Sequence, residues 1–380
     1  MQHGNASVPG HRRGGLPAGD GLHAPAQAGP GKAGHRLREG QEIIDYAYSH
    51  GVNYFDTAYV YHGGQSESFI GQALKKYPRE SYFLATKMPI WCVKKQEDVE
   101  RIFNEQLQKC QVDYFDFYLF HAQDAGNFKK CQEFGVYEFL SRMKAEGKIR
   151  RLGFSFHDTP EVLRHICDTY DWDFAQIQLN YLDWEMQDAR TQYQILADRG
   201  IPVVVMEPVR GGALASPCDA ANILFREERP DKSVASWAIR FVASLPGVLT
   251  VLSGMSDMEQ VRDNVDTMTN FEPLTERDRE IIDAALEAYR KKDTVPCTGC
   301  RYCMDCPFGV DIPKMFALYN HFVLDKDEED YLEAYRAQPE ETLADKCRAC
   351  GACLSKCPQH IKIPEKMAAI RETVDKLSAK

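Results

Sequence analysis

Seven short apolar runs that alternate with helical stretches constrain the fold of this chain more than any other feature. The runs are rich in β-branched and aromatic residues and span residues 52–56, 82–87, 115–121, 149–155, 174–178, 201–206 and 247–254. Apolar residues recur at spacings of three and four in the stretches 66–77, 96–110, 136–147 and 232–244. This alternation predicts a parallel sheet covered by helices. Seven such strands are one βα unit short of a (β/α)8 TIM-type barrel.

The segment before these runs has a different composition. Residues 1–38 are crowded with Gly, Pro, His and Arg, and they contain no Ile, Phe, Tyr or Trp. Such a segment cannot offset its ordering entropy, so we predict a disordered or anomalous segment over 1–38 and the barrel over 39–290. The first barrel strand is then missing or altered. Either the start of the sequence is frame-shifted or wrongly joined, or the chain is a genuine variant with a basic tail.

Length, charge and hydropathy narrow the class of protein. The chain has 380 residues, of which 44% are hydrophobic, so it can bury a sizeable core. Its formal charge of -10 argues against nucleic-acid or anionic-membrane partners held by bulk electrostatics. No apolar run reaches the roughly 18 residues of a membrane span, and no secretion signal is visible. We therefore expect a cytoplasmic protein whose partners are small molecules or other proteins.

Cysteines are concentrated near the C-terminus in two dense runs. The first run consists of Cys297, Cys300, Cys303 and Cys306, followed by Pro307, and the second of Cys347, Cys350, Cys353 and Cys357, followed by Pro358. This spacing is strong evidence for a metal-binding domain over 291–380, with a polar helical stretch, 318–338, between the runs. The other five of the thirteen cysteines are scattered, and we predict that they are inert buried thiols.

Both cysteine runs resemble the pattern of bacterial ferredoxins, in which the cysteine before proline reaches across to the other cluster. The resemblance implies one [4Fe–4S] cluster held by Cys297, Cys300, Cys303 and Cys357, and a second held by Cys347, Cys350, Cys353 and Cys306. The first run has two residues instead of three before its last cysteine, which leaves a single cluster as an alternative. Two zinc sites with four cysteines each would also use eight thiolates.

Polar residues close three successive predicted strands. Asp56, Lys87 and His121 stand where these apolar runs end, and the carboxyl ends of strands in a parallel barrel meet at one rim. Each residue alone has a structural explanation, as a helix cap, a solvated amine or a core imidazole. Together they favour an active site.

The run Asp56-Thr57-Ala58-Tyr59-Val60-Tyr61, followed by Gly64 and Ser66-Glu67, resembles the signature of the aldo/keto reductase family. The resemblance implies a catalytic set of Asp56, Tyr61, Lys87 and His121, whereas Tyr59 stands at the wrong offset. Carbonyl reduction needs a proton at oxygen, and a phenol with a pKa near 10 gives one up only when a cation stabilises the phenolate. Lys87 would be that cation and Asp56 its partner, while His121 would orient the carbonyl.

The same resemblance implies a nicotinamide cofactor on the barrel rim, and no GxGxxG sequence follows any predicted strand. The implied cofactor residues are Ser155 and Gln176 at the carboxamide, Met206 at the ring, and Gly254, Ser256, Gln260 and Asn264 near the phosphates and adenosine. Many family members place an arginine near Ser256 to hold a 2′-phosphate. The cofactor is therefore NADPH or NADH.

The whole chain resembles aldo/keto reductases with a C-terminal ferredoxin-type domain, which implies NAD(P)H-dependent reduction of a small aldehyde or ketone. Nicotinamide moves two electrons as hydride, whereas iron–sulfur clusters move one at a time. Either a flavin or a redox partner protein splits the pair, or the clusters are structural or redox-sensing. One alternative is an electron-transfer or redox-sensing protein with the barrel as a scaffold. Another is an inactive product of the altered N-terminus.

Overall fold

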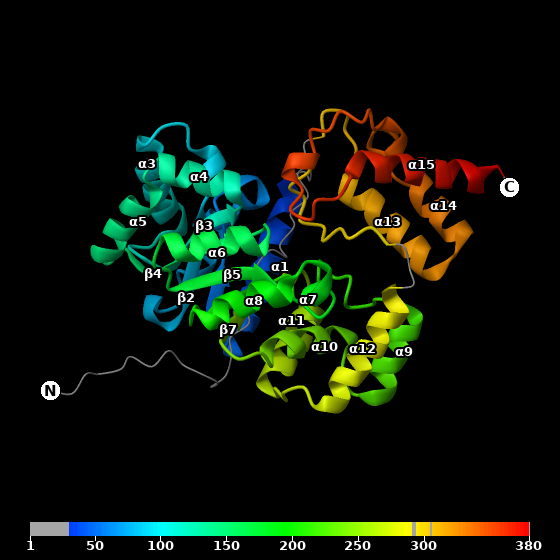
Figure 1. Ribbon diagram of the computed structural model, residues 1–380, viewed down its shortest axis with the longest axis horizontal. Helices are drawn as coiled ribbons and strands as arrows, with labels where there is room; N and C mark the ends of the chain where they lie inside the picture. The colour runs from blue at the N-terminus through cyan, green and yellow to red at the C-terminus, as the bar shows by residue number, and fades with distance from the viewer. Residues whose placement is uncertain (1–29, 291–293, 305, 380) are drawn as a thin grey trace. The chain divides into compact units, whose positions relative to one another are not determined.

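The computed structural model describes residues 30–290, 294–304 and 306–379 of the chain. These residues form two compact parts (Figure 1). The first contains the residues up to Pro208 together with Ala238–Leu274, and the second contains Val209–Trp237 together with the residues from Thr275 onward. None of the helices within the described ranges is long and apolar enough to cross a membrane.

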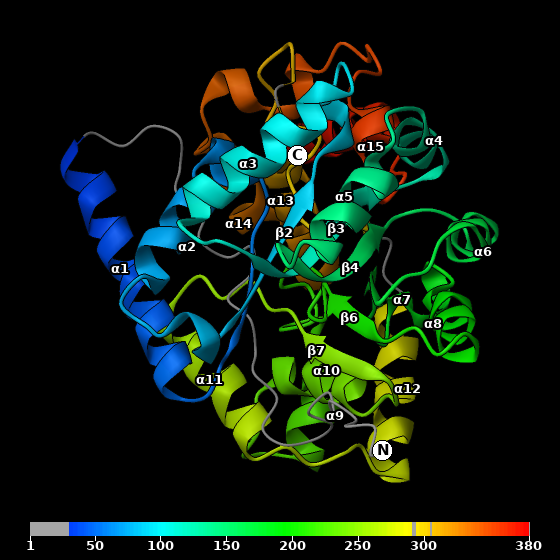
Figure 2. The same cartoon turned by 90° about the vertical axis from the view of Figure 1, so that its left-hand side faces the viewer.

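The first part is built on one sheet of seven parallel strands, ordered along the sheet as along the chain. The strands are β1 Tyr54–Asp56, β2 Phe83–Met88, β3 Phe115–Gln123, β4 Ile149–Phe156, β5 Phe174–Gln178, β6 Val203–Met206 and β7 Val248–Val251. The sheet curls into a nearly closed barrel, which confirms the predicted fold class (Figure 2). All seven predicted strands are present.

Helices alternate with these strands, as the three-and-four spacing predicts. Those of the first part are α1 Pro30–Ser49, α2 Ser66–Leu74, α3 Glu97–Cys110, α4 Ala125–Glu133, α5 Val136–Ala145, α6 Pro160–Thr169, α7 Asp183–Met186, α8 Ala189–Asp198 and α11 Met258–Thr269. Helix α10, Val234–Ala243, has residues in both parts. Helix α1 lies beside α2 and α11 (Figure 2). Its first residue precedes the predicted start of the barrel at Glu39, and residues 1–29 lie outside the described ranges.

The barrel interior is filled by large side chains from neighbouring strands. A buried cluster inside the sheet contains Tyr54, Leu119, Phe174 and Val204. Gly153 of β4 allows this packing, because a Cβ atom there would lie 2.4 Å from the carbonyl oxygen of Phe174. The C-terminal ends of the strands are thereby fixed relative to one another, and the polar residues follow at those ends.

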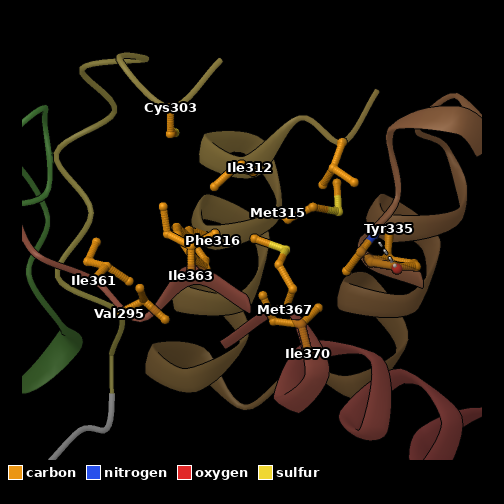
Figure 3. Close-up of a cluster of buried hydrophobic side chains, with 12 residues drawn as sticks. Val295, Cys303, Ile312, Met315, Phe316, Tyr335, Ile361, Ile363, Met367 and Ile370 are labelled. Carbon is orange, nitrogen blue, oxygen red and sulfur yellow. Dashed lines mark hydrogen bonds between the residues drawn. The ribbon is translucent and has the colours of Figure 1, made fainter. Parts of the chain in front are cut away.

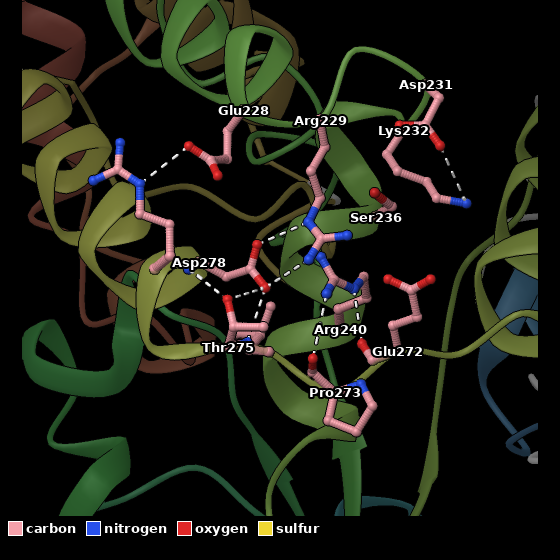
Figure 4. Close-up of polar contacts among 12 residues, drawn as sticks. Glu228, Arg229, Asp231, Lys232, Ser236, Arg240, Glu272, Pro273, Thr275 and Asp278 are labelled. Atoms are coloured by element: carbon pink, nitrogen blue, oxygen red, sulfur yellow. Dashed lines mark hydrogen bonds and ion pairs between the residues drawn. The ribbon is translucent and has the colours of Figure 1, made fainter.

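The second part consists of helices and the cysteine-bearing segments. Its helices are α9 Asp219–Glu228, α12 Glu276–Arg290, α13 Ile312–Asp325, α14 Glu328–Arg336 and α15 Ile363–Ser378. Helices α9 and α12 pack side by side (Figure 1), and Arg229 donates to both carboxylate oxygens of Asp278 at 2.8 and 2.9 Å (Figure 4). A buried cluster joins α13 and α15 through Phe316, Met367 and Ile370, and Cys303 belongs to it (Figure 3).

The helical stretch predicted over 318–338 is divided between two helices, α13 and α14. The break lies at Lys326, whose φ of 62° is left-handed and ends α13. Asp327 then caps α14 by accepting a hydrogen bond from the amide of Asp330 at 3.0 Å. The sequence Asp-Lys-Asp at 325–327 contains both the end of α13 and the cap of α14. Short 3-10 helices cover Tyr61–Gly64, Arg79–Ser81, Ile90–Cys92, Glu340–Thr342, Ala344–Lys346 and Leu354–Lys356.

Candidate active site and cysteine sites

The four predicted catalytic residues come from three neighbouring strands and one loop. Asp56 ends β1, Lys87 lies near the end of β2, His121 lies near the end of β3, and Tyr61 opens the turn after β1. Parallel pairing brings these ends together, with Lys87 opposite Leu119, two residues before His121. The structure therefore gathers all four at one end of the sheet.

Lys87 is the buried cation of this group. Its side chain has no exposed surface, and its Nζ contacts the Asp56 carboxylate and donates to the carbonyl oxygen of Thr57 at 2.9 Å. The same nitrogen lies 4.7 Å from the centre of the Tyr61 ring. A buried charge without a partner would cost several kcal/mol, so the Asp56 carboxylate is what allows Lys87 to lie beside the phenol as a cation.

His121 lies against the Tyr61 ring on the other side of the site. The two ring centres are 5.7 Å apart at an interplanar angle of 81°. Burial, followed by the nearby Lys87 cation and by His157, holds the pKa of His121 well below its ordinary value. The imidazole is therefore neutral near pH 7, and a neutral imidazole can donate one hydrogen bond to a carbonyl oxygen.

Trp91 forms an exposed aromatic wall beside this group. Its ring centre is 4.9 Å from that of His121, and 41% of its surface is exposed. It follows β2 in the short 3-10 helix Ile90–Cys92. Sequence reasoning missed this residue, although an aromatic residue shortly after the strand-end Lys87 was a signal that could have found it.

A buried polar network fixes β2 behind Lys87. Glu67 of α2 accepts hydrogen bonds from the Thr86 hydroxyl and from Gln106 Nε2 of α3, both at 2.7 Å. Gln106 Nε2 also donates to the backbone carbonyl of Lys87 at 2.9 Å, and the Tyr118 hydroxyl donates to Gln106 Oε1. Sequence reasoning noted Glu67 only as part of the motif. Its role depends on a partner 39 positions away, which no local pattern shows.

Three predicted cofactor residues lie on adjacent strands. Ser155 pairs with Gln176 in the register of β4 and β5, and its hydroxyl accepts from the Ala122 amide at 2.8 Å. Gln176 Nε2 contacts Met206 Sδ at 3.4 Å. Among the described residues, the buried Gln176 Oε1 has no hydrogen-bond partner. A buried acceptor of this kind fits an amide donor such as a nicotinamide carboxamide.

The remaining predicted cofactor residues form their own group after β7. Gln260 Oε1 accepts from the backbone amide and the hydroxyl of Ser256 at 2.8 and 3.2 Å, and Asn264 donates to Ser253 Oγ at 2.8 Å. Gly254, Ser256 and Gln260 are exposed at the start of α11, while Asn264 is buried. The exposed N-terminus of a helix offers backbone amides and a positive dipole end to an anion.

The cysteine thiols fall into two sets that each draw on both runs. The pKa of Cys303 is raised to about 12 by burial and by the neighbouring thiols of Cys300, Cys297 and Cys357.

Burial, followed by Cys347, Cys306 and Cys350, likewise raises the pKa of Cys353. One cavity is lined by Cys306, Cys347, Cys350 and Cys353, and also by Cys303 of the other predicted set. All thirteen cysteines are free thiols.

Within the described ranges, no three His, Cys, Asp or Glu side chains converge as ligands of a single metal ion. A tetrahedral zinc site would need four ligand atoms around one ion. A [4Fe–4S] cluster spreads its thiolates over four irons, so its ligands stay further apart.

Comparison with known proteins identifies a family for each of the two sequence regions. The sequence profile of the Aldo/keto reductase family matches residues 27–287, and that of a 4Fe-4S dicluster domain matches residues 296–361. The NADH-specific methylglyoxal reductase of Escherichia coli is 27% identical over a 267-residue alignment that covers 59% of this chain and 81% of the relative. The glyoxal reductase of Bacillus subtilis is 26% identical and covers 65% of this chain and 83% of the relative.

Solved structures show the same fold. The holo form of an aldo-keto reductase from Bacillus halodurans superimposes with a TM-score of 0.58 at 24% identity, covering 72% of this chain and 91% of that chain. An aldo-keto reductase from Klebsiella pneumoniae in complex with NADPH gives a TM-score of 0.56 at 22% identity, covering 71% and 89%. The chain therefore belongs to the aldo/keto reductase family of oxidoreductases and carries a 4Fe-4S dicluster domain at its C-terminal end.

Proposed function

We propose that the barrel reduces a small aldehyde or ketone with NAD(P)H. The observation that carries this proposal is the buried Lys87–Asp56 pair beside Tyr61, with the neutral His121 ring against the same phenol. This arrangement can deliver a proton to a carbonyl oxygen and stabilise negative charge that develops there. Two relatives are named as reductases of methylglyoxal and glyoxal, so a small α-oxoaldehyde is the substrate class to test first.

The nicotinamide cofactor supplies the hydride. Gln176 and Ser155 would hold its carboxamide, with Met206 against the ring, and the start of α11 would receive its phosphates. Ser256 carries no charge to hold a 2′-phosphate, and one relative is named as NADH-specific. We therefore expect the barrel to accept NADH as well as NADPH.

The proton comes from Tyr61. Its hydroxyl donates to the carbonyl oxygen, and the phenolate left behind is stabilised by the Lys87 cation. Asp56 keeps that cation in place, and the Glu67–Gln106 network fixes the backbone of Lys87 from behind. His121 donates a second hydrogen bond to the same oxygen, and Trp91 limits the space available to the substrate.

Replacing Tyr61 by phenylalanine tests the proposal. We expect Tyr61→Phe to lower kcat for methylglyoxal by about 10³-fold, because general-acid catalysis contributes about 10²- to 10⁴-fold. Tyr59→Phe is the matched control, because the Tyr59 hydroxyl already donates its proton in a hydrogen bond to Glu105 Oε2 at 2.7 Å. It should keep nearly full activity. Equal losses in both variants, or no loss in Tyr61→Phe, would contradict the assignment.

For the C-terminal domain we propose two [4Fe–4S] clusters, one on Cys297, Cys300, Cys303 and Cys357 and the other on Cys347, Cys350, Cys353 and Cys306. The thiol neighbourhoods described above support these two sets. Each set has a buried or half-buried core and one exposed member, Cys300 or Cys350. Exposed ligands favour electron exchange with a redox partner protein or a flavin, which makes one-electron transfer a second candidate function.

The two candidate functions separate in the Tyr61→Phe variant. If the clusters act independently of the barrel, their reduction by dithionite and their potentials should be unchanged while methylglyoxal reduction is lost. Visible absorbance near 400 nm and electron paramagnetic resonance report the cluster reduction. A cluster potential that shifts with this substitution would contradict independent action.

A further inference from the structure

The chain makes a tight, self-bonded turn directly after β6. The amides of Gly212 and Leu214 donate to the carbonyl oxygen of Val209 at 3.1 Å, and the amide of Ala213 donates to that of Arg210 at 3.1 Å. Arg210 and Gly211 both adopt left-handed φ values, 53° and 62°, and Arg210 is only 2% exposed. The turn is therefore a compact unit with its own hydrogen bonds.

Gly211 of this turn lies directly against the first cysteine loop. A Cβ atom on Gly211 would lie 1.9 Å from the carbonyl oxygen of Thr298 and 2.6 Å from its carbonyl carbon. Real Cβ atoms do not approach backbone this closely, so only glycine fits. Thr298 stands between Cys297 and Cys300 and is 5% exposed. Both residues belong to the same compact part of the molecule.

The cysteine loop is anchored on its other side to α13. The amide and the carbonyl of Val295 form hydrogen bonds with the Asn320 side chain at 2.7 and 2.8 Å. Val295 belongs to the same buried cluster as Cys303 (Figure 3), and the amide of Cys297 donates to the carbonyl oxygen of Val295 at 2.8 Å. The loop is thus held firmly at Val295.

We propose that the Cys297–Cys300 loop supports the turn after β6, so that loading of the first cluster strengthens nucleotide binding in the barrel. The inference rests on the proposed function, in which Met206 faces the nicotinamide and Cys297 and Cys300 hold iron. Met206 ends β6 and is joined to Gly211 by a short stretch of chain. Iron–sulfur bonds to Cys297 and Cys300 would fix the position of the loop. The fixed loop would hold the turn in place, and the ordered turn would restrict the conformations of the residues that follow Met206. Gly211 and Thr298 are positioning residues.

The first test compares the wild-type protein before and after its iron is removed anaerobically with a chelator, and again after reconstitution. NADPH binding is followed by quenching of protein fluorescence, a readout that does not require turnover. We expect the Kd to rise about ten-fold without the clusters and to return on reconstitution, which is within the range of couplings between two sites. Equal Kd values for loaded and iron-free protein would overturn the inference.

The second test uses two glycine variants of the loaded protein. Gly211→Ala must displace Thr298, and we expect it to weaken NADPH binding about ten-fold and to abolish the difference between loaded and iron-free protein. Gly212→Ala is the control, because Gly212 also has a left-handed φ, 92°, but no atom lies within 4 Å of its Cβ position. Gly212→Ala should keep the difference in NADPH affinity between the loaded and the iron-free protein. Wild-type affinity in Gly211→Ala would also overturn the inference.

The two tests separate this inference from the proposed function. If loaded wild-type protein reduces methylglyoxal and binds NADPH with an affinity that does not depend on iron, the inference fails and the function stands. If the loaded protein binds no nicotinamide nucleotide, both fail. Should Gly211→Ala not fold, the wild-type comparison decides alone.

Discussion

At the scale of single residues, the site depends on charges placed where water is absent. Lys87 and Asp56 are both almost completely buried, and such a pair is a poor source of stability, because desolvation offsets most of the attraction. The pair is explained better by its place beside Tyr61 than by folding. Glu67 is a second buried carboxylate in the same region, and it touches neither Tyr61 nor His121 in the contacts described above.

Glu67 gives the protein a predictable pH dependence. Burial raises its pKa above the ordinary 4.5, and this outweighs the hydrogen bonds from Thr86 and Gln106 and the charge of Lys109, which lower it. The folded state thus holds this proton more tightly than the unfolded state does. Its contribution to stability is complete below pH 4.5 and is lost as pH rises through the raised pKa.

Glu67→Gln removes the titrating proton while its amide oxygen can still accept from Thr86 and Gln106. We expect the stability of this variant relative to wild type to improve as pH rises from about 5 to 7. Urea unfolding at both pH values measures the change. Parallel profiles for the two proteins would show that Glu67 does not titrate in this window.

At the scale of elements, helices α2 and α3 approach each other closely at one glycine. A Cβ on Gly71 of α2 would lie 2.5 Å from the carbonyl carbon and oxygen of Cys110, at the end of α3. This approach brings Glu67 of α2 within hydrogen-bond distance of Gln106 of α3. The packing of α2 against α3 therefore also positions the Lys87 backbone, because Gln106 donates to the carbonyl oxygen of Lys87.

Gly71→Ala should therefore destabilise the barrel, although alanine favours a helix by about 1 kcal/mol over glycine. We expect a net loss of about 1 to 3 kcal/mol from overpacking, together with a lower kcat. Chemical denaturation and steady-state kinetics measure both. Gly126→Ala in α4 is the control, because its Cβ would meet only Asp124 Oδ1, at 3.3 Å. A stabilised Gly71→Ala variant would contradict the close packing.

The sequence predicts the elements well and their long-range contacts poorly. All seven strands were predicted, because each apolar run is bounded by polar or turn residues and buried in a parallel sheet. The positions of Asp56, Tyr61, Lys87 and His121 followed from strand ends and from the family signature. The links from Glu67 to Gln106 and from Gly211 to Thr298 join distant segments, so no local spacing indicates them. The division of the helical stretch 318–338 into two helices has a local cause, the cap at Asp327.

At the scale of the whole molecule, the cysteines of the dicluster domain pack on its apolar core. Cys303 is part of the buried cluster of the second part, and Cys297, Cys306, Cys347, Cys353 and Cys357 pack against it. Metal bound by such residues contributes directly to folding. The compact part that holds them also includes α9 and α12, which the barrel profile covers, so sequence modules and compact parts do not coincide.

Metal analysis of anaerobically purified protein tests the two-cluster assignment. Two clusters of four irons predict about eight irons and eight sulfides per chain. Removing the iron should lower the melting temperature of the protein, since thiolates without iron no longer hold the two cysteine runs together. About four irons would indicate a single cluster, and zinc without sulfide would replace the assignment with structural zinc sites.

The central claim is that the barrel itself transfers hydride to a carbonyl carbon. Its most direct test is reduction of methylglyoxal with NADH or NADPH that carries deuterium at the transferred position, with mass analysis of the product. The account predicts one deuterium at the former carbonyl carbon of each alcohol formed, and no alcohol from Tyr61→Phe at comparable rates. An alcohol without deuterium, formed while the clusters bleach, would show that electrons pass singly through the iron–sulfur domain and would contradict the account.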